Sequence, residues 1–388
     1  MPSQYQLRQF FRQVPNELLS LYFESSEVEL YVDFENLGET QVEPIFKAFI
    51  TLPEDQQADM DKDFQDINVL ASDSGIAALR DEAKFYGDET FPEEISNITG
   101  LHAKSMWAFL HKPKIWKGAA HLQHVGNGTC HFWKKINGLP KVPPHVDEED
   151  IGRLGDAVSN YFHKIEGRGR NCKVEVYDEV KTGKVHLYAY LEDYGQSGME
   201  WERNDLAISS RHSAFEIIFV NCQGEGSLDI YAPKNTKAVP ELQKIFAKNI
   251  LKLDTLADCT IGKRVYNLNI LAKPDFEFQP PAEAGISEVI VTKLRVSLMD
   301  TMVRIELEAD TKQNNMAVYD LLEKLKLRSY HITQASIKVV FKARPGKCSW
   351  SKTFTVTYPN TCNLNHHGYD AIIRHMLTAT GIDSGEDD

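Results

Sequence analysis

The hydrophobic periodicity of this 388-residue chain changes near residue 171, and this change constrains the fold more than any other feature. Before it, apolar side chains recur at the three- or four-residue spacing that is typical of amphipathic helices. After it, apolar and polar side chains alternate, which is typical of half-buried strands. We therefore expect an α+β protein in which a helical, acidic N-terminal domain precedes a β-rich domain.

Signals for helix starts recur along the first part of the chain. Ser3, Pro15 and Thr51 each precede an apolar stripe with helical spacing, and these residue types are favoured where helices begin. A proline-rich run at 139–144 then predicts a linker. A further helix is expected over 147–162, before the strands begin.

The order of predicted elements in the second part of the chain repeats itself. Two hairpins followed by an amphipathic helix occur twice, and the helices begin at Asn235 and Asn363. The second copy carries an extra helix over 316–327. The predicted strands span residues 173–180, 184–193, 213–222 and 226–233 in the first copy, and 287–298, 302–309, 335–345 and 350–360 in the second. This order predicts an internal duplication, with two unrelated α+β layers as the alternative.

These patterns divide the chain into four predicted segments. A helical domain occupies residues 1–144, and a linking helix with a Gly/Arg hinge occupies residues 145–171. Two related hairpin–hairpin–helix units follow at 172–271 and 272–388, the second of which ends in a short acidic tail. Each sheet is expected to bury one face beneath its helix.

Charge is strongly segregated within the predicted helical domain. Residues 1–100 contain 21 Asp and Glu against 6 Lys and Arg, whereas residues 101–144 contain seven Lys, five His and no acid. The whole chain has a net charge of −13. Such segregation favours an interaction surface, although the acidic residues also fit an ordinary solvated face. The basic segment is expected to contact either another molecule or the acidic part of its own chain.

Lysines and tryptophans alternate through the basic segment, a combination that binds phosphates and stacks on bases in single-stranded nucleic acids. Two arginines in the Gly-Arg-Gly-Arg sequence at 167–170 add guanidinium groups that match phosphate. The predicted nucleic-acid-binding residues are Lys104, Lys112, Lys114, Trp116, Lys117, Trp133, Lys134, Lys135, Lys141, Arg168 and Arg170. In the alternative, the tryptophans belong to a helical core, the lysines are simply exposed, and the arginines lie in a polar loop.

The same segment contains a partial set of zinc ligands. His121 and His124 lie on one face of a predicted helix, and Cys130 and His131 follow a glycine turn. These four side chains are the kinds that bind Zn²⁺ tetrahedrally. Zinc modules usually contain a cysteine pair, however, and this segment has none, so an accidental cluster in a His-rich stretch is the alternative.

Two strand carboxylates raise the possibility of hydrolysis. Glu216 and Asp229 lie on adjacent predicted strands, and Lys234 follows the second strand. Such residues can hold Mg²⁺ and position water in metal-dependent nucleases. The acid-x-Lys spacing of those enzymes is absent here, and carboxylates pointing to solvent are the simpler explanation. A metal-dependent nuclease or hydrolase is therefore the alternative function.

The leading expectation is a non-enzymatic interaction subunit or adaptor. The sequence contains no phosphate-binding loop, dinucleotide fingerprint, nucleophile elbow or His-Glu-x-x-His motif. Its six cysteines are dispersed, and no apolar run has the length of a membrane span or a signal peptide. We expect a cytoplasmic, bacterial assembly such as a phage-defence system, with another protein chain as partner and nucleic acid as a second candidate.

Overall fold

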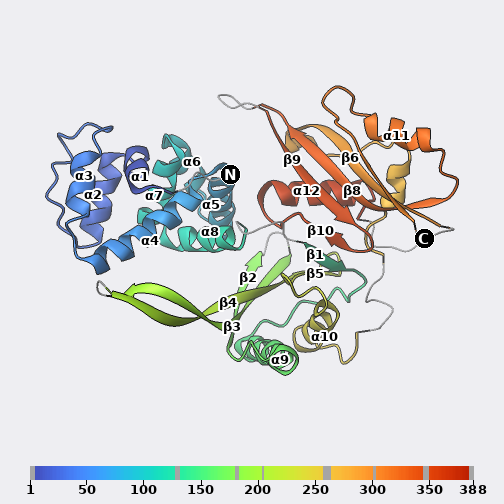
Figure 1. The fold of residues 1–388 in the computed structure, drawn as a ribbon, viewed down its shortest axis with the longest axis horizontal. Coiled ribbons are helices and arrows are strands. Elements are labelled where there is room, and N and C mark those ends of the chain that lie inside the picture. Colours follow the sequence, from blue (N-terminus) through green and yellow to red (C-terminus); the bar gives the residue numbers. More distant parts are fainter. Residues whose placement is uncertain are drawn as a thin grey trace. The chain divides into compact units, whose positions relative to one another are not determined.

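The structure is a computed structural model that describes residues 5–126, 132–179, 183–202, 205–256, 264–299, 303–343 and 349–383. It contains two compact units, Met1–Thr129 and Cys130–Asp388, and each is described by itself. The first unit is helical, and the second contains a large antiparallel sheet with helices packed on it (Figure 1). The α+β class expected from the periodicity is confirmed.

Two helices of the first unit begin where the sequence signals predict, whereas Ser3 lies outside the described residues and α1 begins after Gln6. The second and fourth helices start directly after Pro15 and Pro53, whose fixed φ suits the start of a helix. The helices are α1 (Leu7–Gln13), α2 (Asn16–Ser25), α3 (Glu43–Phe49), α4 (Glu54–Leu70), α5 (Asp73–Phe85), α6 (Phe91–Asn97), α7 (Leu101–His111) and α8 (Pro113–Gly126).

An aromatic cluster forms the core of the first unit. Phe64 of α4 is buried, and its ring packs against rings from α1, α2 and α3 at centroid distances of 4.8–6.3 Å. Aromatic pairs at these distances each add about 0.5–1.5 kcal/mol beyond the area they bury. The apolar stripes that predicted the helices therefore meet in one core, while most acidic side chains remain outside it.

The ten described strands of the second unit form one sheet in the order β2-β3-β4-β5-β1-β10-β9-β8-β6-β7. The strands are β1 (Trp133–Ile136), β2 (Cys172–Glu179), β3 (Lys184–Glu202), β4 (Asp205–Cys222), β5 (Ser227–Tyr231), β6 (Ile286–Leu298), β7 (Arg304–Glu308), β8 (Tyr330–Phe341), β9 (Trp350–Thr357) and β10 (Thr361–Cys362). The helices are α9 (Glu148–Glu166), α10 (Val239–Asn249), α11 (Ala317–Leu325) and α12 (Gly368–Ala379).

Helices cover opposite faces of the two halves of this sheet. Leu228 and Ile230 of β5 face a core that includes residues of α9 and α10. Cys362 of β10 lies on the other face, because Trp133 of β1 is paired with both Tyr231 and Cys362 and strand partners share a face. Cys362 belongs to the core that includes α12. Asp229, between Leu228 and Ile230, therefore points to the α12 side.

The two predicted hairpin–hairpin–helix units share their order of elements but differ in strand pairing. In the first half, β2, β3, β4 and β5 pair in chain order. In the second half, β6 pairs with both β7 and β8. This difference arises because β7 is an edge strand and α11 carries the chain back to the other side of β6. The predicted duplication is not confirmed by this pairing.

Strand β1 was not expected, because its sequence Trp-Lys-Lys-Ile was placed in the basic segment of the helical domain 1–144 and no strand was predicted there. It lies between β5 and β10 and joins the two halves into one sheet. For this reason the first unit ends at Thr129 and not at the proline-rich run after residue 138. None of the helices in the described ranges combines the length and apolar composition needed to cross a membrane.

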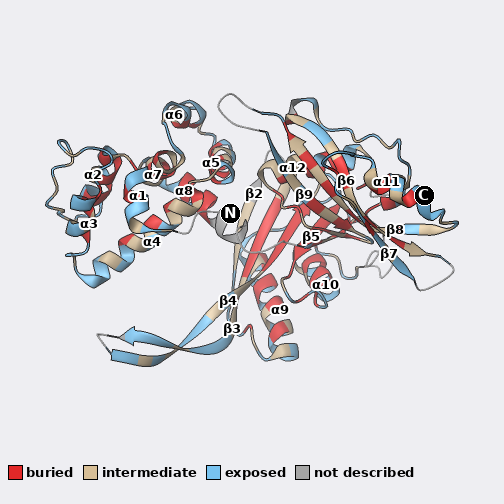
Figure 2. Cartoon of the chain, turned by 45° about the horizontal axis from the view of Figure 1, so that its top comes forward, coloured by how far each residue is buried: buried red, intermediate tan, exposed pale blue. Residues whose placement is uncertain are grey.

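Strands β3 and β4 extend far beyond their neighbours. Pairing of β2 with β3 ends at Leu191, and pairing of β5 with β4 begins at Ile218. Residues 195–202 and 205–212 therefore pair only with each other, as a two-stranded ribbon that we call the β-arm. Figure 2 shows the β-arm projecting from the sheet as a largely exposed ribbon, in contrast to the buried central strands.

Candidate functional site

The structure divides the predicted nucleic-acid-binding residues between its two units. In the first unit, Lys104 of α7 is half-buried and Lys114 and Lys117 of α8 are exposed. Lys112 forms ion pairs with Asp88 at 2.7 Å and Glu94 at 3.0 Å. These ion pairs are of the kind expected if the basic segment contacts the acidic part of its own chain. The indole of Trp116 is buried against Phe109 at a centroid distance of 4.8 Å.

In the second unit, the aromatic and basic residues predicted to contact nucleic acid are mostly engaged within the protein. Trp133 and Lys135 of β1 are buried, whereas Lys134 is half-buried and Lys141 is exposed. Arg168 is held by Glu166 at 2.7 Å and Asp193 at 2.8 Å, so its guanidinium fixes the hinge. Arg170 is exposed.

The predicted zinc ligands lie outside the side chains that the structure describes. His121 and His124 belong to α8, but their side chains are not among those described, and Cys130 and His131 fall outside the described ranges. Elsewhere, the described residues contain no group of three or more His, Cys, Asp and Glu side chains placed to hold a metal ion.

The three predicted catalytic residues do not converge. Asp229 is paired across the ladder with Val220, and Glu216 lies four residues earlier on β4, about 13 Å away at strand spacing. Lys234 is exposed beyond the end of β5. Burial raises the pKa of Glu216 to about 7. Glu216 and Asp229 are therefore too far apart to share one cation.

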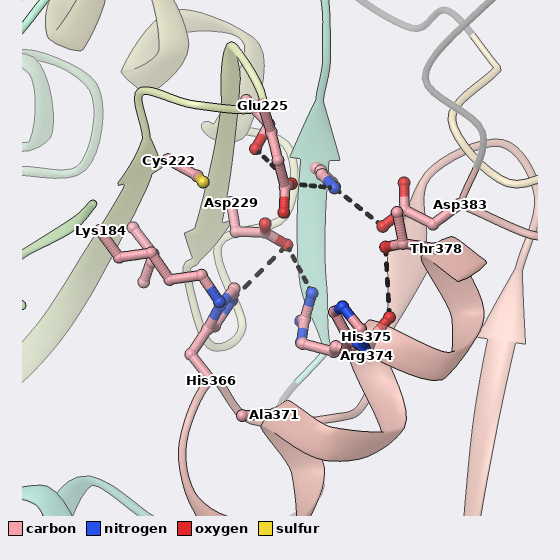
Figure 3. Close-up of a pocket in the computed structure, with 13 residues that line it drawn as sticks. Lys184, Cys222, Glu225, Asp229, His366, Ala371, Arg374, His375, Thr378 and Asp383 are labelled. Carbon is pink, nitrogen blue, oxygen red and sulfur yellow. Dashed lines mark hydrogen bonds and ion pairs between the residues drawn. The ribbon is translucent and has the colours of Figure 1, made fainter. Parts of the chain in front are cut away.

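Asp229 instead leads to a polar cavity of about 100 Å³ between the sheet and α12 (Figure 3). Strand register places Lys184, Cys222 and Ser227 side by side, and it places Lys135 opposite Asp229. The cavity is lined by Lys135, Lys184, Val220, Cys222, Glu225, Ser227, Asp229, His366, Ala371, Arg374, His375, Thr378 and Asp383. Four strands of the sheet, β1, β3, β4 and β5, and helix α12 thus supply most of its lining residues.

Two groups of ion pairs organise the cavity. Arg374 Nη1 donates to Asp229 Oδ1 at 3.3 Å, while Nε and Nη2 donate to the Leu364 carbonyl at 3.1 and 2.8 Å. Lys135 Nζ donates to Asp383 at 2.8 Å and Glu225 at 2.9 Å. The first group ties α12 to β5, and the second ties β1 to the turn before β5 and to the residues after α12.

The pKa shifts in this network follow from burial and pairing. Burial alone would lower the pKa of Lys135, but the carboxylates of Asp383, Asp229 and Glu225 raise it above its usual value. Burial would raise the pKa of Glu225, yet Lys135 holds it below its usual value. For Asp229, burial outweighs Arg374 and raises the pKa. Lys135 is therefore firmly charged, and its ion pair with Glu225 persists into mildly acidic solution.

The cavity contains hydrogen-bond donors but no activated nucleophile. Burial, with the charges of Arg374 and Lys184, lowers the pKa of His366 well below its usual value, so its imidazole is neutral at pH 7. Burial raises the pKa of the Cys222 thiol, which keeps it protonated and weakly nucleophilic. Ser227 Oγ donates to the Glu225 carboxylate, which is a weak base because Lys135 lowers its pKa. Thr378 Oγ1 donates to the Arg374 carbonyl, so neither hydroxyl is paired with an imidazole or an amine.

The β-arm presents a second kind of site, an apolar face. Met199 lies opposite Ile208, and Trp201 lies opposite Leu206, so all four side chains share one face of the ribbon. Their exposed fractions are 72%, 79%, 76% and 49%, respectively. The opposite face is polar, with Glu200 and Arg211 paired at 3.6 Å. The β-arm is thus amphipathic and exposes its apolar face.

Sequence reasoning missed both of these sites, although signals for them exist. In Met-Glu-Trp at 199–201 and Leu-Ala-Ile at 206–208, large apolar residues occur at every second position, which is the period of a strand. This pattern was overlooked because a polar, glycine-containing run precedes it. Arg374 lies beside Ile373 in an apolar helix, and a charge in such a stripe indicates a buried partner. The contributions of Lys184, His366 and Asp383 had no local signal.

Comparisons with known proteins identify no family for this chain. No family model matches it, and no curated protein matches it at a significant level. The assignment of function therefore rests on the geometry of the β-arm and of the polar cavity.

Proposed function

We propose that this chain is a non-enzymatic interaction subunit that docks on a partner protein through the apolar face of its β-arm. The observation that carries the proposal is the exposure of Met199, Trp201, Leu206 and Ile208 on one face of a projecting ribbon. Tryptophan is prominent among the residues that dominate binding energy at interfaces. Burying each of these large side chains contributes about 1.5–3 kcal/mol before the costs of association.

The physics of two-stranded ribbons supports this proposal. An isolated hairpin is marginally stable in water and gains stability when a third strand or another layer covers its apolar face. Among the described strands, the β-arm has pairing partners only within itself. A partner that covers this face supplies the missing layer.

Charge defines the kind of partner. Residues 192–212, which comprise the β-arm and its base, contain five acidic and two basic side chains. Nucleic-acid binding depends on neutralising phosphates with Lys and Arg, so this element is unsuited to it. The proposed partner is a protein with an apolar groove flanked by basic residues, because complementary charge favours association and fixes orientation.

Three further expectations remain part of the proposal. A cytoplasmic location is supported by Cys172, Cys222 and Cys362, which are free thiols. A duplicated origin of the sheet is supported by the shared order of hairpins and helices in its two halves. Nucleic-acid contact by the basic segment is supported by the exposure of Lys114 and Lys117.

The proposal is tested with a double variant of the apolar face, Trp201→Ser/Ile208→Ser. The control, Gln196→Ser/Ala207→Ser, changes the polar face of the same ribbon. Proteins retained by the tagged wild-type chain are identified, purified and titrated against all three chains by calorimetry. We expect one partner whose affinity falls at least about tenfold in the apolar-face variant, is kept in the control, and weakens with salt.

Two results would contradict the proposal. In the first, every retained protein binds the apolar-face variant as tightly as the wild type. In the second, the wild-type chain associates with itself in sedimentation experiments and the apolar-face variant does not, so that a second copy covers the face. Circular dichroism of the variants confirms that each is folded before binding is compared.

A further inference from the structure

The polar cavity holds donor groups that the protein itself does not use. Lys184 of β3 lines the cavity. Its charge lowers the pKa of Glu225, but none of the hydrogen bonds that join the described cavity-lining residues uses its ammonium group. The three carboxylates of the cavity are already engaged, Asp229 by Arg374 and both Glu225 and Asp383 by Lys135. Lys184 therefore acts on Glu225 through its charge alone and makes no hydrogen bond to the other described cavity-lining residues.

His366 is a second cavity-lining residue with unused hydrogen-bonding capacity. Its side chain is only 4% exposed, and neither ring nitrogen has a hydrogen-bond partner among the described residues. The Nε2 atom lies 3.7 Å from Asp229 Oδ1, which is beyond hydrogen-bonding distance. Figure 3 shows His366 and Lys184 pointing into the same space as the Asp229 carboxylate. A buried imidazole without partners is costly unless something in the cavity completes its hydrogen bonds.

We infer that the cavity binds a phosphate-sized oxyanion through Lys184 and His366. Its volume of about 100 Å³ is well above the ~10–15 Å³ that a single water requires, yet it is too small for a nucleotide. Lys184 supplies a charged donor and His366 a neutral N–H donor to the oxyanion. This inference is independent of the function proposed for the β-arm.

In its ionised form, paired with Arg374, Asp229 makes the site selective for a protonated oxyanion. Hydrogen phosphate carries a P–OH group that can donate to the free lone pairs of this carboxylate, whereas sulfate at neutral pH carries no proton. Sulfate would place bare oxygen against the carboxylate, and like charges repel at this distance in a buried site. The cavity is therefore expected to accept phosphate and to discriminate against sulfate.

The ligand would touch elements from three places in the chain. Lys184 belongs to β3, Asp229 to β5, and His366 to the segment directly before α12. A bound oxyanion would connect that segment to the sheet in addition to the Arg374–Asp229 pair. Because binding only to the folded state raises stability, phosphate is expected to raise the unfolding temperature in a saturable manner.

The test uses the full chain with phosphate, sulfate and acetate as separate probes at equal ionic strength. Thermal unfolding is followed by circular dichroism for wild type, Lys184→Gln and the control Lys141→Gln, which removes an exposed lysine of the same unit. We expect a saturable phosphate-dependent rise of the unfolding temperature in wild type and control that is lost in Lys184→Gln. Sulfate and acetate are expected to give no saturable rise.

If Lys184→Gln does not fold, a second measurement tests whether phosphate binds in the cavity. Phosphate added to the wild-type chain should shift the ring resonances of His366, assigned by comparison with His366→Gln, while sulfate should not. Equal phosphate effects in wild type and Lys184→Gln, equal effects of phosphate and sulfate, or a response to acetate alone would each overturn the inference. So would unchanged His366 resonances at saturating phosphate.

Discussion

Lys135 is the residue whose placement departs furthest from its sequence context. It follows Trp133 and Lys134 in a basic stretch, yet it is buried and bridges Glu225 and Asp383. Removing one partner from a buried ion pair leaves the others charged and desolvated, which costs more than the pair contributes. The neighbouring Lys134 is half-buried on the other face of β1 and has no such role.

We predict that Lys135→Met lowers the free energy of unfolding by about 3–5 kcal/mol, because the buried carboxylate of Asp383 loses its counter-charge. Lys134→Met is expected to change it by less than about 1 kcal/mol. Urea unfolding followed by circular dichroism measures both variants. A similar loss in the two variants would mean that the ion pairs of Lys135 contribute little.

Glu216 gives a prediction for pH dependence. Burial raises its pKa from 4.5 to about 7 in the folded state, so folding takes up a proton between these two values. Glu216 therefore does not destabilise the folded state below about pH 4.5. As the pH rises through about 7, the folded state must lose this proton, and the free energy of unfolding falls. Glu216→Gln is expected to be more stable than wild type at pH 8 by ~1–3 kcal/mol.

The measurement for Glu216 compares urea unfolding at pH 4.5 and pH 8. The difference between Glu216→Gln and wild type should be small at the lower pH and large at the higher one. Glu200→Gln, which neutralises an exposed carboxylate of the β-arm, serves as control and should show no such change. A difference that is the same at both pH values would show that the carboxylate is not the cause.

At the scale of elements, the β-arm contrasts with the rest of the sheet. The central strands gain their stability from cores on one or both faces, whereas residues 195–212 pair only with each other. We predict that replacing residues 196–211 by an Asn-Gly turn, which favours a tight hairpin, keeps the sheet folded. The free energy of unfolding should change by less than about 1 kcal/mol.

Circular dichroism and urea unfolding test the arm-deleted chain, with the full chain as reference. Loss of cooperative unfolding would contradict the prediction and would show that the β-arm supports the core. Retained folding together with lost partner binding would instead separate the docking element from the scaffold that carries it.

The elements that sequence predicts are those whose signal is local. Helix α4 follows Pro53 and carries a regular apolar stripe, and β4 ends in the apolar run before Cys222, so both were predicted. Strand β1 was missed because its identity comes from β5 and β10, which are distant in sequence. Asp229 was expected to point to solvent, but it is buried. Its partner Arg374 lies 145 residues away, and no local pattern connects the two.

At the scale of the whole molecule, charge segregation is the clearest feature. The exposed Lys114 and Lys117 of α8 lie in a segment without acids. The proposed contact with nucleic acid predicts salt-sensitive binding of single-stranded DNA or RNA that Lys114→Glu/Lys117→Glu weakens at least about tenfold. Fluorescence anisotropy at two salt concentrations measures it.

The matched control for this prediction is Lys47→Glu/Lys62→Glu, which changes the net charge equally at exposed positions of the same unit outside the basic segment. Equal weakening in both variants would mean that only the overall charge matters. No binding by the wild-type chain at low salt would leave the basic segment with its intramolecular contact to Asp88 and Glu94.

The position of β1 has a consequence for synthesis of the chain. Trp133 emerges early, but one of its two strand partners is Cys362, which is made more than 200 residues later. Until then, the edge of β1 that will pair with β10 stays open and can pair with other chains. The incompletely synthesised chain is therefore prone to aggregation. Its need for chaperones should fall when β10 pairs with β1 and covers this edge.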